Sequence, residues 1–270
     1  MGEQPQSDYR SFSFIITNER KYHEWDEKRR VVRGMFGLGQ RRISYSKMRD
    51  SRKWNAANAF VSAMNSIRGV STTFLVDKRI VHLFGDLSRY AGQTLGGLAV
   101  TSWKPHVLER MARLILAFFT AGLASDEQDI IWITDEDEIV ANETRREAAS
   151  NALLNSLARF AHCQLRGIYV ATTAYDTGTL ELEDFAAIPD VIGGAVTEAL
   201  SDKWREGIPL TELVTPPTLR ITPRADLLIG ELFNPTARLR KLVYAIAPRD
   251  LRPVMSEVTI HTDRIRIPLA

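Results

Sequence analysis

The sequence predicts an α/β fold in which helices cover a mixed β-sheet. Short segments with the alternation of strands are interleaved with longer segments that have helical periodicity. The chain has 270 residues and is 44% hydrophobic, which is enough for a substantial core. A run of β-branched and aromatic residues at 130–133 ends in several carboxylates, as expected of a central strand that leads to a ligand-binding edge.

The first half of the chain alternates between the two patterns. In chain order we expect a strand over 11–17, a hairpin arm over 31–39, a helix over 51–68, strands over 72–77 and 79–84, and a helix over 105–124. Gly34, Gly37 and Gly39 are the expected turn residues of the arm. Pro105 suits the first turn of the long helix, because proline lacks an N–H group that would be unpaired there.

The second half continues in the same way and then changes character. We expect a strand ending near 134, a helix from near 139 to 162, a strand over 167–172, helices over 182–204 and 225–233, and strands over 239–247 and 254–262. Prolines cluster between residues 209 and 223 and indicate a connection. The sequence therefore predicts a core over 1–207 and a small C-terminal extension over 208–270, packed on that core.

Composition excludes several classes of protein. The apolar stretches are too short or too polar to span a bilayer, and the N-terminus lacks the apolar core of a signal peptide, so we expect a cytoplasmic protein. The single cysteine, Cys163, excludes an internal disulfide and is expected to be a buried structural thiol. The five histidines lack metal-ligand spacing, and no phosphate-binding loop or serine-hydrolase elbow occurs.

The apolar run at 130–133 is expected to be a fully buried strand with Asp135 and Asp137 at its carboxyl end. Adjacent carboxylates repel each other, and a divalent metal ion would relieve that repulsion. Alternatively, Thr134 and Asp135 cap a helix that begins near residue 139. Both interpretations stay open at this point.

A second constellation lies on the helix expected over 182–204. Glu183, Ala187, Asp190 and Gly194 are expected to share one surface stripe of that helix at three- and four-residue spacing. Small residues beside a carboxylate allow a metal, a substrate or another backbone to approach closely. Alternatively, the helix begins at Pro189, and Asp190 is a favourable acid in its first turn.

Charge is distributed unevenly, although the net charge is only +2. Basic residues interleaved with aromatic ones fill residues 20–53, as expected of a segment that tracks a phosphate backbone. The side chains expected to contact nucleic acid are Arg29, Arg30, Arg41, Arg42 and Lys47. The alternative is a solvated face that Glu24, Asp26 and Glu27 partly neutralise.

Several short motifs together resemble a family of bacterial and phage proteins that have an RNase H-like fold and are catalogued as a domain of unknown function. The motifs are Ile-Ser-Tyr-Ser-Lys at 43–47, Phe-Leu-Val-Asp-Lys at 74–78, Ile-Trp-Ile-Thr-Asp at 131–135, Ile-Pro-Asp-Val-Ile-Gly-Gly at 188–194, and the tail segments 225–229 and 239–242. The family typically opens with an Asp-Glu-Ser-Gly box on its first strand. This chain has Thr-Asn-Glu-Arg at 17–20 instead.

The resemblance implies an RNase H-like mixed sheet and a metal-dependent nuclease that hydrolyses phosphodiester bonds of DNA or RNA. It implies one or two Mg²⁺ (or Mn²⁺) ions held at a site whose acids correspond to Asp135, Asp190 and Asp77 of this chain. For the acid missing from the first strand, either Glu19 serves in its place, or Asp137, as a further metal ligand, or Glu183, as a further catalytic acid, compensates. Because the first strand lacks its acid, the alternative is a catalytically degenerate RNase H-like subunit. Such a subunit would bind nucleic acid or a protein partner, which includes a second copy of the chain.

Overall fold

A computed structural model of the chain describes residues 9–19, 23–80, 83, 105–134, 142–205, 222–249, 252–258 and 260. The chain divides into two compact units. Unit 1 contains residues 1–77, 187–248 and 254–270, and unit 2 contains residues 78–186 and 249–253.

The sheet of unit 1 is mixed. Its strand order is β1 (Tyr9–Thr17), β2 (Gly69–Asp77), β5 (Leu239–Arg249) and β6 (Arg252–Glu257). β1 is antiparallel to β2, whereas β2 is parallel to β5. The predicted α/β class with a mixed sheet flanked by helices is therefore confirmed. β5 comes from the residues predicted as a C-terminal extension, and it lies between β2 and β6 within the sheet.

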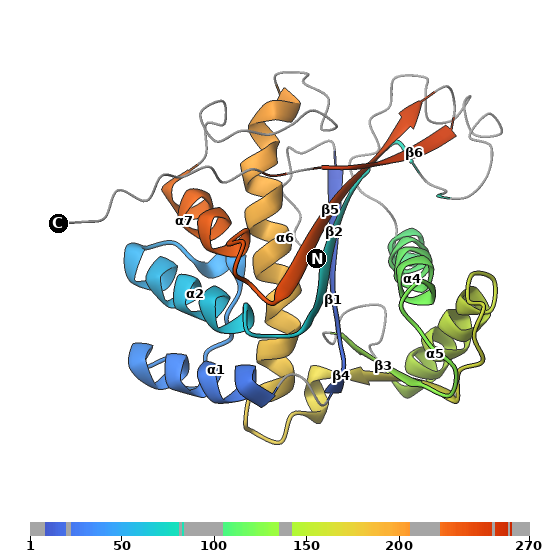
Figure 1. The fold of residues 1–270 in the computed structure, drawn as a ribbon, viewed down its shortest axis with the longest axis horizontal. Coiled ribbons are helices and arrows are strands. Elements are labelled where there is room, and N and C mark those ends of the chain that lie inside the picture. Colours follow the sequence, from blue (N-terminus) through green and yellow to red (C-terminus); the bar gives the residue numbers. More distant parts are fainter. Residues whose placement is uncertain are drawn as a thin grey trace. The chain divides into compact units, whose positions relative to one another are not determined.

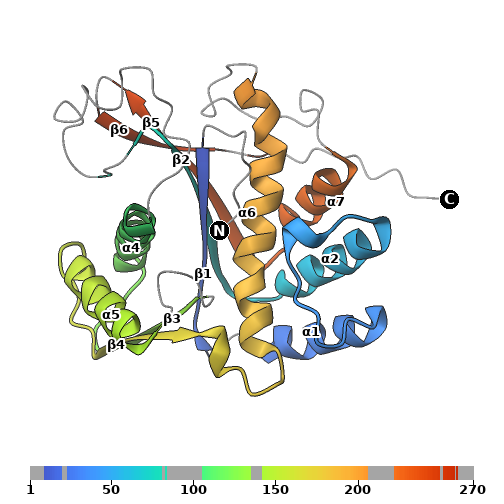
Figure 2. The same cartoon turned by 180° about the vertical axis from the view of Figure 1, so that it is seen from behind.

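Three helices of this unit, and the part of a fourth helix from Ala187 onward, lie on one side of the β1–β2–β5 strands (Figures 1 and 2). They are α1 (His23–Phe36), α2 (Ser51–Met64), α6 (Glu181–Arg205) and α7 (Pro223–Leu232). α1 and α2 pack through Trp25 and Phe60, which are fully buried and meet edge to face with their ring centroids 6.4 Å apart. α6 approaches β1 closely, because a Cβ atom on Gly193 would overlap the hydroxyl of Ser13.

The two faces of the sheet differ in chemistry. Ser13 faces α6 and forms a 2.9 Å hydrogen bond with the hydroxyl of Thr73 on the neighbouring strand. Side chains alternate along a strand, so Phe14 and Phe74 point to the other face. There Phe74 lies edge to face with Phe14 and stacks on Tyr244 at 5.4 Å between ring centroids.

Unit 2 contains a βαβ arrangement. Parallel strands β3 (Asp129–Thr134) and β4 (Gly167–Thr172) are joined through α5 (Glu143–Leu157), which packs against β4 and against α4 (Pro105–Ala121). The expectation of a fully buried strand at 130–133 is wrong: Ile131 is 57% exposed, as is Tyr169 directly opposite it on β4. The face of this two-stranded described sheet that carries Ile131 and Tyr169 is therefore incompletely covered.

The hairpin arm predicted over 31–39 is also wrong, because α1 extends to Phe36. Gly37 takes the left-handed conformation with φ of 57° and ends the helix. Its N–H donates to the carbonyl of Gly34 at 3.2 Å, and that of Leu38 donates to the carbonyl of Arg33 at 3.0 Å. The glycines expected to form a hairpin turn thus close a helix instead.

Two other boundaries differ from expectation. α6 runs unbroken through Pro189 from Glu181, so Asp190 is not in its first turn. The predicted strand over 79–84 is a turn at Arg79 where the structure describes it. α5 is capped by Asn142, whose Oδ1 accepts from the N–H of Arg145 at 2.9 Å.

Among the described helices, none combines the length and the apolar character that crossing a membrane requires.

Candidate nucleic-acid interface

The acids predicted to bind metal lie in different settings. Asp135 and Asp137 fall outside the described residues. Asp77 ends β2 and is 2% exposed, Glu183 lies in the first turn of α6, and Asp190 lies further along the same helix. In the part of the chain that the structure describes, no three His, Cys, Asp or Glu side chains gather to hold a metal ion. The described acids alone therefore do not supply a metal centre.

Asp190 instead holds the backbone of a distant segment. Its Oδ2 accepts a 2.9 Å hydrogen bond from the N–H of Tyr45, which begins the short 3₁₀ helix η2 (Tyr45–Lys47). Gly194, one turn later on α6, lies directly under the ring of Tyr45, and a Cβ atom there would overlap that ring. We expected a metal, a substrate or another backbone to approach this stripe of α6, and the structure shows another backbone there. Ala187 is fully buried rather than on a surface stripe.

Tyr45 is held from its other side by Glu198 and Arg224. Its hydroxyl donates to Oε2 of Glu198 at 2.9 Å, and the same carboxylate forms an ion pair with Nη2 of Arg224. The Arg224 guanidinium carbon lies 4.3 Å from the Tyr45 ring centroid, a cation–π geometry. Burial, reinforced by the neighbouring Glu198 carboxylate, raises the pKa of the Tyr45 hydroxyl above its ordinary value. Tyr45 therefore remains a neutral hydrogen-bond donor.

These contacts fix residues 41–49, which we call the anchored loop. Ile43, Tyr45 and Met48 are its anchors, with exposed fractions of 8%, 6% and 4%. Nη1 of Arg224 donates to the carbonyl of Met48 at 2.9 Å, so the loop is held at two points of its backbone. The exposed cations of the loop are Arg41 and Arg42 before the first anchor, Lys47 between Tyr45 and Met48, and Arg49 after the last anchor.

The start of the anchored loop is tied to α1. Nη1 of the buried Arg33 donates to the carbonyl of Gly39 at 2.8 Å and to that of Arg41 at 3.3 Å. The guanidinium of Arg33 therefore stabilises the fold rather than facing solvent. The anchored loop itself contains no acidic residue, and the nearest acid on its C-terminal side is Asp50, which caps α2.

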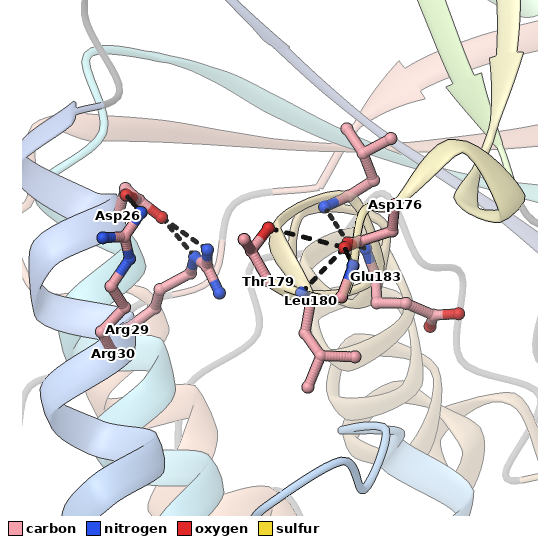
Figure 3. A network of polar contacts seen from close by, with 9 residues as sticks. Asp26, Arg29, Arg30, Asp176, Thr179, Leu180 and Glu183 are labelled. Carbon is pink, nitrogen blue, oxygen red and sulfur yellow. Dashed lines mark hydrogen bonds and ion pairs between the residues drawn. The ribbon is translucent and has the colours of Figure 1, made fainter.

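Two of the five cations predicted to contact nucleic acid lie in a different environment. Arg29 is fully buried, with Nε 2.6 Å from Oδ1 of Asp26 (Figure 3). Its guanidinium lies over the ring of Trp25. Arg30 bonds the other carboxylate oxygen of Asp26 at 2.6 Å. Arg29 therefore belongs to the core. Arg30 is 61% exposed, although it is paired with Asp26. The exposed cations of the predicted set that lie on the anchored loop are Arg41, Arg42 and Lys47, and the loop adds Arg49.

Asp176 is a further carboxylate with a defined role (Figure 3). Its Oδ1 accepts from the N–H groups of Gly178 and Leu180 at 3.1 and 2.9 Å, and its Oδ2 accepts from that of Leu182 at 2.8 Å and of Glu183 at 3.4 Å. Burial acts to raise the pKa of Asp176, but these four backbone hydrogen bonds together lower it below its ordinary value. Asp176 thus caps the N-terminus of α6.

Sequence reasoning did not identify Glu198, Arg224 or Asp176. A signal for Glu198 existed, since Asp190, Gly194 and Glu198 repeat every four residues along one stripe of α6. Arg224 had no such signal, because its contact with Tyr45 joins residues 179 positions apart.

Comparisons with protein-family models, with curated proteins and with solved structures find no match for this chain.

Proposed function

We propose that the protein binds nucleic acid through the phosphate backbone, with Arg41, Arg42, Lys47 and Arg49 of the anchored loop as its contacts. The observation that carries this proposal is the pattern of burial along the loop. Three apolar anchors are nearly inaccessible, while the four cations between and beside them are exposed. An acid-free run of exposed cations on a fixed backbone suits a polyanion.

The energetic argument has two parts. Each cation that neutralises a phosphate releases condensed counterions, which favours binding without regard to base sequence. Arginine adds planar, two-pronged donation to phosphate oxygens. Because Tyr45 and Met48 are already held in place, the loop loses little conformational freedom when it binds. We therefore expect binding that depends strongly on salt and weakly on sequence.

A metal-dependent nuclease with an RNase H-like fold is the second candidate. It is supported by the parallel pairing of β3 with β4, since parallel strands end at the same edge of a sheet. Asp135 follows directly after Thr134, the last residue of β3, and Asp137 lies two positions further on. If Mg²⁺ or Mn²⁺ were held there, it would stabilise charge on the phosphodiester oxygens. Asp190 enters this candidate only if its Oδ1 is available, because Oδ2 already accepts from Tyr45.

Equilibrium titration of fluorescently labelled single-stranded DNA, duplex DNA and RNA tests the proposal. In the presence of a chelator and about 50 mM KCl, we expect binding, with the logarithm of the association constant falling linearly with the logarithm of salt concentration. Absence of binding to all three polymers would refute the proposal. Incubation of the same labelled polymers with Mg²⁺, Mn²⁺ or chelator tests the second candidate, which requires cleavage that depends on the metal.

A further inference from the structure

Glu198 is the point where three segments of unit 1 meet. One carboxylate oxygen accepts from the hydroxyl of Tyr45 at 2.9 Å and pairs with Arg224. The other accepts from the hydroxyl of Thr222, which caps the N-terminus of α7. The side chain of Glu198 is only 10% exposed, and all its described partners are donors. It therefore links α6, α7 and the anchored loop through one carboxylate.

Arg224 completes the same arrangement from α7. Its guanidinium covers the face of the Tyr45 ring, donates to the carbonyl of Met48, and is paired with Glu198. Its side chain is 22% exposed, in contrast to the exposed cations of the anchored loop. The charge of Arg224 is thus directed at the loop backbone and at Glu198.

We propose that Glu198 and Arg224 are positioning residues for nucleic-acid binding, which hold the anchored loop in its binding conformation before the ligand arrives. This inference rests on the proposed function, because it assigns the clamp a role in that binding. Lys47 lies between the two clamped residues, Tyr45 and Met48, so the clamp fixes the backbone on both sides of it. Releasing the clamp leaves every exposed cation in the sequence but makes the loop flexible. The cost of ordering the loop then falls on the binding step.

The test uses Arg224→Lys. This substitution keeps the positive charge but removes the planar guanidinium, which stacks on the Tyr45 ring and donates to both Met48 and Glu198. We expect nucleic-acid affinity to fall on the order of tenfold, with an unchanged salt slope because the phosphate contacts are the same. We also expect limited trypsin digestion to cut after Lys47 and Arg49 in the variant and not in the wild type. Glu198→Gln, which keeps the oxygen that accepts from Tyr45 but loses the charge that pairs with Arg224, is expected to act in the same direction.

Arg238→Lys is the matched control. Arg238 also pairs with a carboxylate, Glu24, but that pair is about half exposed, and exposed pairs contribute little to stability. We expect this variant to retain wild-type affinity and trypsin resistance. Rapid cleavage of the wild type after Lys47 would show that the clamp does not hold the loop.

The outcomes separate the two proposals. If the wild type binds no nucleic acid, the proposed function fails, and the trypsin experiment still reports on the clamp. If the wild type binds but Arg224→Lys changes neither affinity nor digestion, the positioning role is refuted.

Discussion

Gly194 of α6 lies directly beneath the ring of Tyr45, so closely that a Cβ atom at position 194 would overlap the ring. The anchored loop can therefore dock on α6 only where the helix has no side chain. The hydrogen bond from the N–H of Tyr45 to Asp190, which lies one turn earlier on α6, also requires the loop to lie close to the helix.

Gly194→Ala is expected to destabilise the protein by about 1–3 kcal/mol, because the added methyl group displaces the ring and the contacts it makes. Gly230→Ala on α7 is the matched control, since a Cβ atom there meets nothing within 4 Å. Without a clash, alanine stabilises a helix interior by about 0.8–1 kcal/mol relative to glycine. Urea unfolding of both variants provides the comparison. Equal effects of the two substitutions would show that Tyr45 does not occupy the predicted space.

Asp190→Asn distinguishes a backbone anchor from a metal ligand. An asparagine oxygen can still accept from the N–H of Tyr45, so we expect a loss of less than about 1 kcal/mol. Asp190→Ala leaves the N–H without this partner and is expected to cost about 1–3 kcal/mol. Thermal melts with Mg²⁺ and with chelator are the measurement. The anchor role predicts that Asp190→Asn and the wild type respond identically to Mg²⁺, whereas loss of a Mg²⁺-dependent stabilisation in the variant would favour the metal site.

Asp176→Ala is expected to cost about 1–3 kcal/mol near neutral pH, because it leaves the N–H groups at the start of α6 without their acceptor. The pKa of Asp176 is lowered in the fold, so its contribution is present above the unfolded value of 3.8 and is lost as pH falls through the folded value. Denaturant unfolding at neutral and acid pH should therefore give a difference between variant and wild type that shrinks with acid. A difference independent of pH would contradict this role.

Lys241 is expected to make the stability of the protein depend on pH in the alkaline range. Burial lowers its pKa from 10.5 to about 8, and its Nζ donates to Oδ1 of the buried Asn65. Between those two values the unfolded chain binds more protons than the folded one, so stability rises as pH increases, by up to about 1.4 kcal/mol per pH unit. We expect Lys241→Met to remove this rise between about pH 8 and pH 9.5. A variant with the same pH profile as the wild type would exclude Lys241 as the source.

Local patterns in the sequence were sufficient for several elements. The strand Gly167–Thr172 was predicted with its observed bounds, and α6 was predicted to within a residue at each end. The spacing of apolar residues predicts a strand, but it does not show whether other residues cover that strand. Ile131 has the character of a core residue, yet it is 57% exposed on a sheet with two described strands.

The candidate interface was predicted only in part, for a related reason. The density of cations in residues 20–53 is visible in the sequence, but their burial is not. Arg29 and Arg33 serve the interior, whereas Arg41 and Lys47 are exposed. Asp190 was recognised as unusual because it is followed by Gly194. That its partner is the backbone of Tyr45, 145 residues earlier, is set by tertiary packing.

The charge-deletion experiment tests the central claim most directly. The salt dependence of duplex DNA binding is compared for the wild type, Lys47→Ala/Arg49→Ala, and the control Arg159→Ala/Arg252→Ala, which removes two exposed cations outside the anchored loop. If both loop cations contact phosphates, the slope of log K against log salt becomes shallower by about 1.8 in the loop variant and stays at the wild-type value in the control. A loop variant with the wild-type slope, or a control that loses as much slope as the loop variant, would contradict nucleic-acid binding by the anchored loop.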